Sequence, residues 1–235
     1  MLNKTTLKLP LAAAFLVCEL VLGILVQVTG GTALVAVSYA CVALACLFVS
    51  LFYEKSHTYY LTQAALVFTL LADLFLVVMS PIQQLPAMVF FSFTQLCYFL
   101  RLYMGHKNRT VQMAHCVARI AVVVLALALT VIVLGENTDA LSLVSLFYYA
   151  NLIVNIIFAF IEFKKEGLLA FGLLLFLLCD TVIGLNVMAS GYLPVAEGSF
   201  IYSILHCNIN LAWIFYVPSQ ALIAISLLKF KKSTV

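Results

Sequence analysis

Charged side chains are scarce in this chain of 235 residues: Asp, Glu, Lys and Arg make up only 9% of it, whereas 66% is hydrophobic. Soluble domains carry roughly a quarter charged residues, and a soluble fold of this size could not bury so much apolar surface. The high hydrophobicity also excludes intrinsic disorder. The net charge of +3, with no basic cluster on a polar face, argues against a nucleic-acid partner. The composition therefore predicts a polytopic helical membrane protein.

Eight mostly apolar segments approach or exceed the roughly 20 residues that a membrane helix needs. They cover residues 8–29, 32–52, 58–79, 86–104, 111–134, 139–162, 167–189 and 205–229. The connections are short, so we expect one transmembrane domain over residues 1–235, an all-α bundle of eight helices. The first apolar run is longer than the core of a typical signal peptide, and we expect it to remain as the first helix.

Lysine and arginine are restricted to one set of connections. All twelve lie at a terminus, in an even-numbered loop or at a helix end beside one, and the odd-numbered loops contain none. By the positive-inside rule, both termini and the even-numbered loops are cytoplasmic. The short loops and the lack of sorting signals favour a bacterial inner membrane.

Cysteine and histidine do not form metal-binding patterns. The seven cysteines fall in or beside apolar segments, which is typical of small packing residues. The four histidines show neither H-x-x-x-H nor H-E-x-x-H spacing. There is no nucleotide-binding loop either, so we expect no cofactor and no metal.

Three acidic residues, Glu19, Asp73 and Asp180, lie inside apolar segments. A carboxylate at mid-membrane costs at least ~2.5–3.5 kcal/mol and marks a candidate functional site. Counted from Ser80 and Ala189, Asp73 and Asp180 lie roughly 10 Å and 14 Å below the outer face. Both helices run outward, so both carboxyls could meet in one cavity. A protonated carboxyl that bonds two helices is the alternative, and for Glu19 the two interpretations stay open.

Polar residues recur at helical spacing in four of the segments. These stripes are Thr62, Thr69 and Asp73; Ser92, Gln95 and Tyr98; Tyr148, Asn151 and Asn155; and His206, Asn210, Trp213 and Gln220. One stripe alone is typical of helix packing in membranes. Four together predict a polar cavity inside the bundle. Pro218 is expected to kink the last helix beside Gln220.

A further polar face near the start of segment 111–134 contains Gln112, His115 and Arg119. Long arginine side chains extend toward the membrane surface when they can. We therefore interpret this face as lying among lipid headgroups.

The two acidic segments resemble each other, which suggests a duplicated half. Residues 68–78, FTLLADLFLVV, align with residues 175–185, LFLLCDTVIGL, and the following segments share a glutamine in TQLCYFL and SQALIAI. Two parallel four-helix repeats would give Asp73 and Asp180 the same orientation. Parallel repeats occur in transporters, and they would also suit an enzyme that uses two carboxyls on one bond.

The segments LLADLFLVV, LLFLLCDTVIGLN and FYVPSQALIAIS resemble the YhhN family of eight-helix membrane proteins, which includes the lysoplasmalogenases. Both Asp motifs and the final Tyr216, Gln220 and Ser226 match best. The family commonly has a histidine one helical turn before a tyrosine in the fourth span, where this chain has Gln95 before Tyr98. Glutamine cannot transfer a proton, so activity is altered or lost if that histidine does chemistry. If it only positions substrate, Gln95 can replace it.

The resemblance implies a cofactor-free hydrolase of ether bonds that converts a lysoplasmalogen to a fatty aldehyde and a glycerophospho-base. Asp73 and Asp180 would be its acid and base, in an order that is not assigned. Five residues are candidates for orienting the substrate: Gln95, Tyr98, Asn186, Tyr216 and Gln220. The partners would be a lysophospholipid and the bilayer. We expect the lipid to enter sideways, with its headgroup toward the outer face.

Two other function classes remain open. Intramembrane acids, polar stripes and a kinked helix also occur in proton- or cation-coupled transporters of a small solute or lipid. A non-catalytic relative that binds lipid would explain the glutamine at position 95. Substitution of either aspartate distinguishes the three, through loss of hydrolysis, loss of coupled uptake, or no effect on either.

Overall fold

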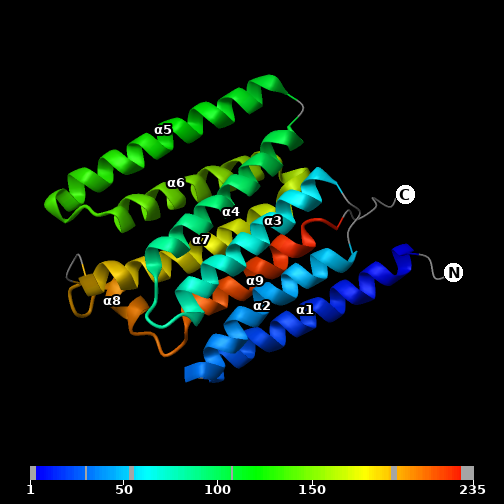
Figure 1. Ribbon diagram of the computed structural model, residues 1–235, viewed down its shortest axis with the longest axis horizontal. Coiled ribbons are helices and arrows are strands. Elements are labelled where there is room, and N and C mark those ends of the chain that lie inside the picture. Colours follow the sequence, from blue (N-terminus) through cyan, green and yellow to red (C-terminus); the bar gives the residue numbers. More distant parts are fainter. Residues whose placement is uncertain (1–3, 30, 53–55, 107, 192–194, 229–235) are drawn as a thin grey trace.

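The protein is all-helical over the residues that the computed structural model describes, which are 4–29, 31–52, 56–106, 108–191 and 195–228 (Figure 1). The long helices are α1 (Lys4–Val28), α2 (Gly31–Phe52), α3 (His57–Asp73), α4 (Gln84–Gly105), α5 (Arg109–Leu134), α6 (Ala140–Ile161) and α7 (Phe163–Gly191). A π-helical turn, η1 (Leu74–Val78), continues α3, and a 3-10 turn, η2 (Gly135–Asn137), follows α5. Two shorter helices come last, α8 (Phe200–Leu205) and α9 (Leu211–Ile225).

Seven helical segments in the described part of the chain are long and apolar enough to cross a membrane. They are Leu9–Val28, Ala33–Leu51, His57–Val78, Gln84–Gly105, Arg109–Asn137, Ala140–Ile161 and Phe163–Ser190. Each coincides with one of the first seven predicted spans. The predicted all-α membrane class is therefore confirmed at this level.

The last predicted span, residues 205–229, differs from the structure. The helix breaks at residues 206–210, and α9 contains only 15 residues. At ~1.5 Å per residue it is roughly 22 Å long, shorter than the usual membrane helix. The side-chain amide of Gln27 in α1 donates to the Asn210 carbonyl (3.2 Å) and its oxygen accepts from the Asn210 N–H (3.0 Å), which satisfies the backbone at the break. The count of eight spans and the two parallel repeats stay predictions.

The helices lie side by side, with α1 and α2 at one edge and α5 at the other (Figure 1). Helix α7 packs along α9 and α3 along α4, whereas α6 contacts α4, α5 and α7. Half of the apolar window of α6 is buried, but only 6% of that of α5. Figure 1 also shows the start of α1, the end of α9, and the α4–α5 and α6–α7 connections at the same end of the bundle.

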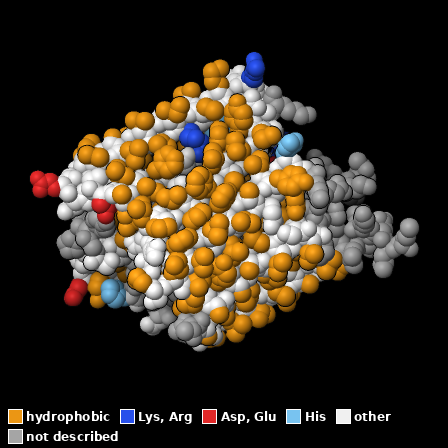
Figure 2. All heavy atoms as spheres, viewed as in Figure 1, with side chains coloured by type: hydrophobic (Ala, Val, Ile, Leu, Met, Phe, Trp, Pro, Cys, Tyr) orange, Lys and Arg blue, Asp and Glu red, His pale blue; other side chains and the backbone are white. Residues whose placement is uncertain are grey.

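Small residues bring α7 and α9 into close contact. A Cβ atom on Gly172 of α7 would lie 2.8 Å from Ile223 Cγ1 and 3.1 Å from the Ile223 backbone nitrogen. Any larger residue would therefore push the two helices apart. Such contacts through small residues are the usual way in which membrane helices pack, because lipid gives no hydrophobic driving force between them. The outer surface is correspondingly apolar, and hydrophobic side chains cover most of the face in Figure 2.

Candidate functional site

Asp73 lies at the end of α3, where the helix changes from α to π geometry. Its side chain is only 2% exposed. The π turn is closed by the Met79 N–H, which donates to the carbonyl of Leu74. Such turns inside helices are frequent at functional sites. The hydroxyl of Tyr216 in α9 donates a hydrogen bond to the Asp73 carboxyl, so α3 and α9 together position this acid.

Asp180 lies within α7 and is half-buried. The hydroxyl of Tyr148 in α6 donates to its carboxyl. One residue further along both helices, the Tyr149 hydroxyl and the Thr181 hydroxyl are 2.6 Å apart and form a second bond between α6 and α7. Two consecutive tyrosines on α6 therefore hold Asp180 and its neighbour.

The two Asp–Tyr pairs belong to the same region of the bundle. The ring of Phe91 in α4 lies 5.5 Å from that of Tyr148 and 5.6 Å from that of Phe176 in α7. Phe176 in turn lies 5.8 Å from Tyr216. A continuous series of aromatic rings therefore connects the two pairs.

This arrangement can hold protons and stabilise positive charge. A hydroxyl that donates to a carboxylate makes a strong, charge-assisted hydrogen bond, and the low dielectric of the bundle interior strengthens it further. Each carboxyl keeps a second oxygen that can accept or deliver a proton. The faces of the aromatic rings between them attract cations. Two carboxyls that differ in burial and partner are suited to separate acid and base roles.

Glu19 is a third buried acid, on α1, and only 2% of it is exposed. Neither of its carboxyl oxygens has a hydrogen-bond partner among the described residues. The third acid is therefore buried with two unsatisfied oxygens in the described part of the chain, which is costly.

Three of the predicted orienting residues are fully buried: Gln95, Tyr98 and Gln220. The Gln95 side-chain oxygen accepts from Asn155 of α6 (3.0 Å), whereas its Nε2 has no partner in the described part of the chain. The Gln220 Nε2 donates to Ser219 Oγ (3.2 Å), and its oxygen has no partner there. The same holds for the Tyr98 hydroxyl. All three side chains therefore bring unused hydrogen-bonding groups into the interior.

The other two orienting candidates differ from each other in position. Tyr216 contacts Asp73 directly, as described above. Asn186 is exposed, and its Nδ2 donates to the Val182 carbonyl of its own helix (2.9 Å). The structure therefore does not bring Asn186 to the Asp–Tyr pairs.

Arg119 occupies a place that the sequence interpretation missed. Its guanidinium lies against α4 and α6. It donates to Asn151 and to Asn155 Oδ1 (2.6 Å) on α6, and its Cζ lies 4.2 Å from the centre of the Phe99 ring of α4. The signal in the sequence was Asn151 and Asn155 at four-residue spacing on a neighbouring segment. Tyr148, on the same stripe, was likewise not predicted as part of the site.

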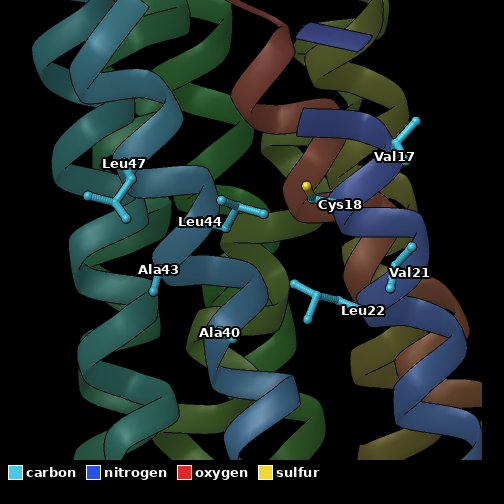
Figure 3. Close-up of a pocket in the computed structure, with 8 residues that line it drawn as sticks. All are labelled: Val17, Cys18, Val21, Leu22, Ala40, Ala43, Leu44 and Leu47. Carbon is cyan, nitrogen blue, oxygen red and sulfur yellow. The ribbon is translucent and has the colours of Figure 1, made fainter. Parts of the chain in front are cut away.

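An apolar groove separates α1 from α2, with a volume of about 560 Å³ (Figure 3). Figure 3 shows Leu22 of α1 and Leu44 of α2 extending toward the facing helix. The lining residues are Val17, Cys18, Val21, Leu22, Ala40, Ala43, Leu44 and Leu47. Apart from the thiol of Cys18, these side chains carry no reactive group. The described residues contain no group of three His, Cys, Asp or Glu side chains placed to hold a metal ion.

Long apolar helices around two Asp–Tyr pairs inside the bundle define a polytopic membrane protein of the α-helical class. A family model described as the YhhN family matches residues 35–227, more than four fifths of the chain. The protein therefore belongs to the YhhN family, and the resemblance seen in its motifs is confirmed. Both aspartates and Gln95 lie inside the match, whereas Glu19 lies before it. No curated protein and no solved structure matches the chain.

Proposed function

We propose that this protein is a membrane-embedded lipid hydrolase of lysoplasmalogenase type. It cleaves the vinyl-ether bond of a lysoplasmalogen to a fatty aldehyde and a glycerophospho-base. Membership of the YhhN family supports this substrate class. The observation that carries the proposal is the pair of carboxyls, Asp73 and Asp180, each bonded to a buried tyrosine and connected through a series of aromatic rings.

The reaction needs one acid and one carboxylate. One of the two aspartic acids transfers a proton to the β-carbon of the vinyl ether, which leaves an oxocarbenium-like centre beside the ether oxygen. The other, as carboxylate, stabilises that centre and takes a proton from the water that adds to it. The resulting hemiacetal collapses to the aldehyde and the free glycerol hydroxyl. Phe91 and Phe176, which lie between the pairs, favour the cationic intermediate through their ring faces.

Gln95 takes a positioning role in this proposal. Asn155 donates to both the backbone and the side-chain oxygens of Gln95 (2.9 and 3.0 Å), which fixes the side chain. Its Nε2 then remains a donor for substrate. Hydrogen bonding of this kind does not require the proton transfer that the family's histidine could perform.

For the topology, we propose that α9 completes an eighth span and that both termini are cytoplasmic, in a bacterial inner membrane. Among the described basic residues, Arg109, Lys164 and Lys165 lie at the start of α5 and at the α6–α7 connection, which share one end of the bundle (Figure 1). Other side chains that contributed to the charge argument lie outside the described residues: Lys4, Lys8, Lys55, Lys107, Lys229, Lys231 and Lys232.

A direct assay tests the hydrolase. The protein is purified in detergent, lysoplasmalogens with choline or ethanolamine headgroups are added, and free fatty aldehyde is measured. We expect release by the native protein and a loss of at least ~100-fold in Asp73→Asn and Asp180→Asn. Glu197→Gln is the matched control, because Glu197 is an exposed acid in the turn before α8. A folded native protein that releases no aldehyde from either headgroup would overturn the proposal.

A coupled transporter is the second candidate. Its support is the interrupted last segment, in which α8 and α9 are separated by a break and α9 contains Pro218. Broken helices beside intramembrane acids are typical of transporter binding sites. Proton-coupled uptake into vesicles that is lost in the same aspartate variants, without hydrolysis, would favour it. A relative that binds lipid but neither cleaves nor transports it, as Gln95 suggests, would show binding alone.

A further inference from the structure

Arg119 is a cation inside the membrane-spanning part of the bundle, and it has no acidic partner among the described residues. It follows the first residue of α5 by ten positions, roughly 15 Å along the helix. The ion pairs within the described ranges are Arg101 with Glu166 (2.6 Å) and His106 with Glu162 (3.0 Å). A charge at such depth is costly unless it is paired. The guanidinium therefore favours an anion.

The groups around the guanidinium are neutral, and three nitrogen donors in this cluster are unused within the described residues. The Arg119 Nη2 lies 3.4 Å from His115 Nε2, which accepts from it, so in the neutral ring Nδ1 carries the proton. That His115 Nδ1, the Arg119 Nε and the Gln95 Nε2 have no hydrogen-bond partner among the described residues. His115 and Gln95 are both 0% exposed. Buried donors without acceptors are rare because each is costly.

Helix α5, which carries Arg119 and His115, lies at the edge of the bundle (Figure 1). Arg119 itself is half-buried rather than enclosed. Figure 2 shows basic atoms surrounded by hydrophobic side chains on the face that includes α5. A ligand that combines an apolar chain with an anionic group matches that surface.

We propose that Arg119, together with His115 and Gln95, binds the phosphate group of the lipid substrate. The assignment of the lipid as substrate rests on the proposed hydrolase function, whereas phosphate binding does not. A guanidinium has five N–H donors; Asn151, Asn155 and His115 take three of those of Arg119, so its Nε–H and one Nη1–H remain for phosphate oxygens.

The spacing along α6 fits one lysophospholipid. Tyr148, which donates to Asp180, precedes Asn151 by three residues and Asn155 by seven, roughly 5 and 10 Å along the axis. The three-carbon glycerol unit that separates the vinyl-ether bond from the phosphate has a comparable length. The bond to be cleaved would then lie at Asp180 and the phosphate at Arg119. The headgroup points toward the end of α6, opposite to the outward direction expected from the sequence.

The test measures binding without hydrolysis. A saturated 1-alkyl lysophospholipid, which has no vinyl-ether bond, is compared with the 1-alkylglycerol of the same chain length, which lacks phosphate. Binding is followed through the fluorescence of the only tryptophan, Trp213, whose ring lies 5.2 Å from that of Tyr216. We expect the native protein to bind the phosphate-bearing lipid about tenfold to a hundredfold more tightly.

Variants on α5 assign that preference to Arg119. Arg119→Gln is expected to remove it, and Arg119→Lys to restore part of it because the charge is kept. Arg109→Gln, at an exposed arginine at the start of the same helix, is the matched control and should retain it. A purely structural Arg119 would change the stability of the protein but not the ratio of the two affinities.

Three results would overturn the proposal. The native protein could bind both lipids equally, an outcome that needs no variant to fold. Arg119→Gln could keep the preference. Inorganic phosphate could displace the lipid at the concentration at which the lysophospholipid itself does, which would assign the cluster to the free anion. None of these depends on whether the protein releases aldehyde, so failure of the hydrolase proposal remains distinguishable.

Discussion

Two polar clusters inside the apolar bundle share α6 but are built in opposite ways. Around Tyr148, α6 contributes to an acidic cluster in which each aspartate accepts a hydrogen bond from a tyrosine. Around Asn151 and Asn155, it contributes to a basic cluster in which Arg119 leaves donors unused. The acidic cluster lies among four packed helices, whereas the basic one includes the peripheral α5. This contrast suggests a division between reaction in the centre and recognition at the edge.

The largest expected effect is a loss of kcat when the acidic cluster is changed and the basic cluster is left intact. Asp180→Asn should lower kcat by about 10²–10⁴-fold, because the carboxyl acts in the proton transfer itself. The preference for a phosphate-bearing lipid should remain, because Arg119 is unchanged. Aldehyde release and Trp213 fluorescence on the same preparation check both halves. If Asp180→Asn lost the phosphate preference as well as kcat, the two clusters would act as a single site.

The reciprocal change is Arg119→Gln. It should raise KM by about tenfold to a hundredfold and leave kcat nearly unchanged, since it removes an interaction made equally in the ground and transition states. Steady-state kinetics with lysoplasmalogen measures the two constants separately. A fall in kcat at unchanged KM would place Arg119 in the chemistry and contradict the division.

The two tyrosines permit a comparison within the acidic cluster. Tyr216→Phe and Tyr148→Phe each remove one hydrogen bond to a carboxyl, which should lower the free energy of unfolding by about 1–3 kcal/mol. Asp73 is buried and Asp180 only half-buried, so the Tyr216 variant should lose more. Denaturation in detergent, followed by helix content, measures both. Equal losses of the free energy of unfolding would show that burial of the acid does not determine how much stability its hydrogen bond contributes.

Gln95 lies between the clusters through its bond with Asn155. Gln95→His, which introduces the residue common in the family, should change kcat/KM by less than about tenfold, the value of roughly one hydrogen bond. The aldehyde assay decides this, with the native protein as reference. A much larger gain would show that this position carries proton transfer and that the glutamine has reduced the activity.

Glu19 should have the smallest effect on activity. Glu19→Leu removes a buried carboxyl that has no partner in the described part of the chain, and should raise the free energy of unfolding by about 1–3 kcal/mol. Hydrolysis should stay at the native level, because Glu19 lies outside both clusters. Stability and activity are measured on the same variant, and a loss of hydrolysis would add Glu19 to the acidic cluster.

Most of the helices could be predicted from the sequence because length and apolarity alone determine which segments can enter a membrane. The break at residues 206–210 could not, since its backbone is satisfied by Gln27, far away in the chain. Asp73 and Asp180 could be picked out as candidate site residues because a carboxyl in an apolar membrane segment costs free energy whatever the rest of the fold is. Their tyrosine partners lie 143 and 32 residues away and were not assigned.

The sequence by itself determined the membrane class, seven of the spans and the two aspartates, because each depends on local composition and on the cost of charge in lipid. The family followed from the same local motifs. Only the tertiary structure decided which side chains meet: Tyr216 with Asp73, Tyr148 with Asp180, and Arg119 with Asn155. The physical reason is that a long polar side chain in a membrane helix has several ways to satisfy its hydrogen bonds, and the packing of neighbouring helices selects one.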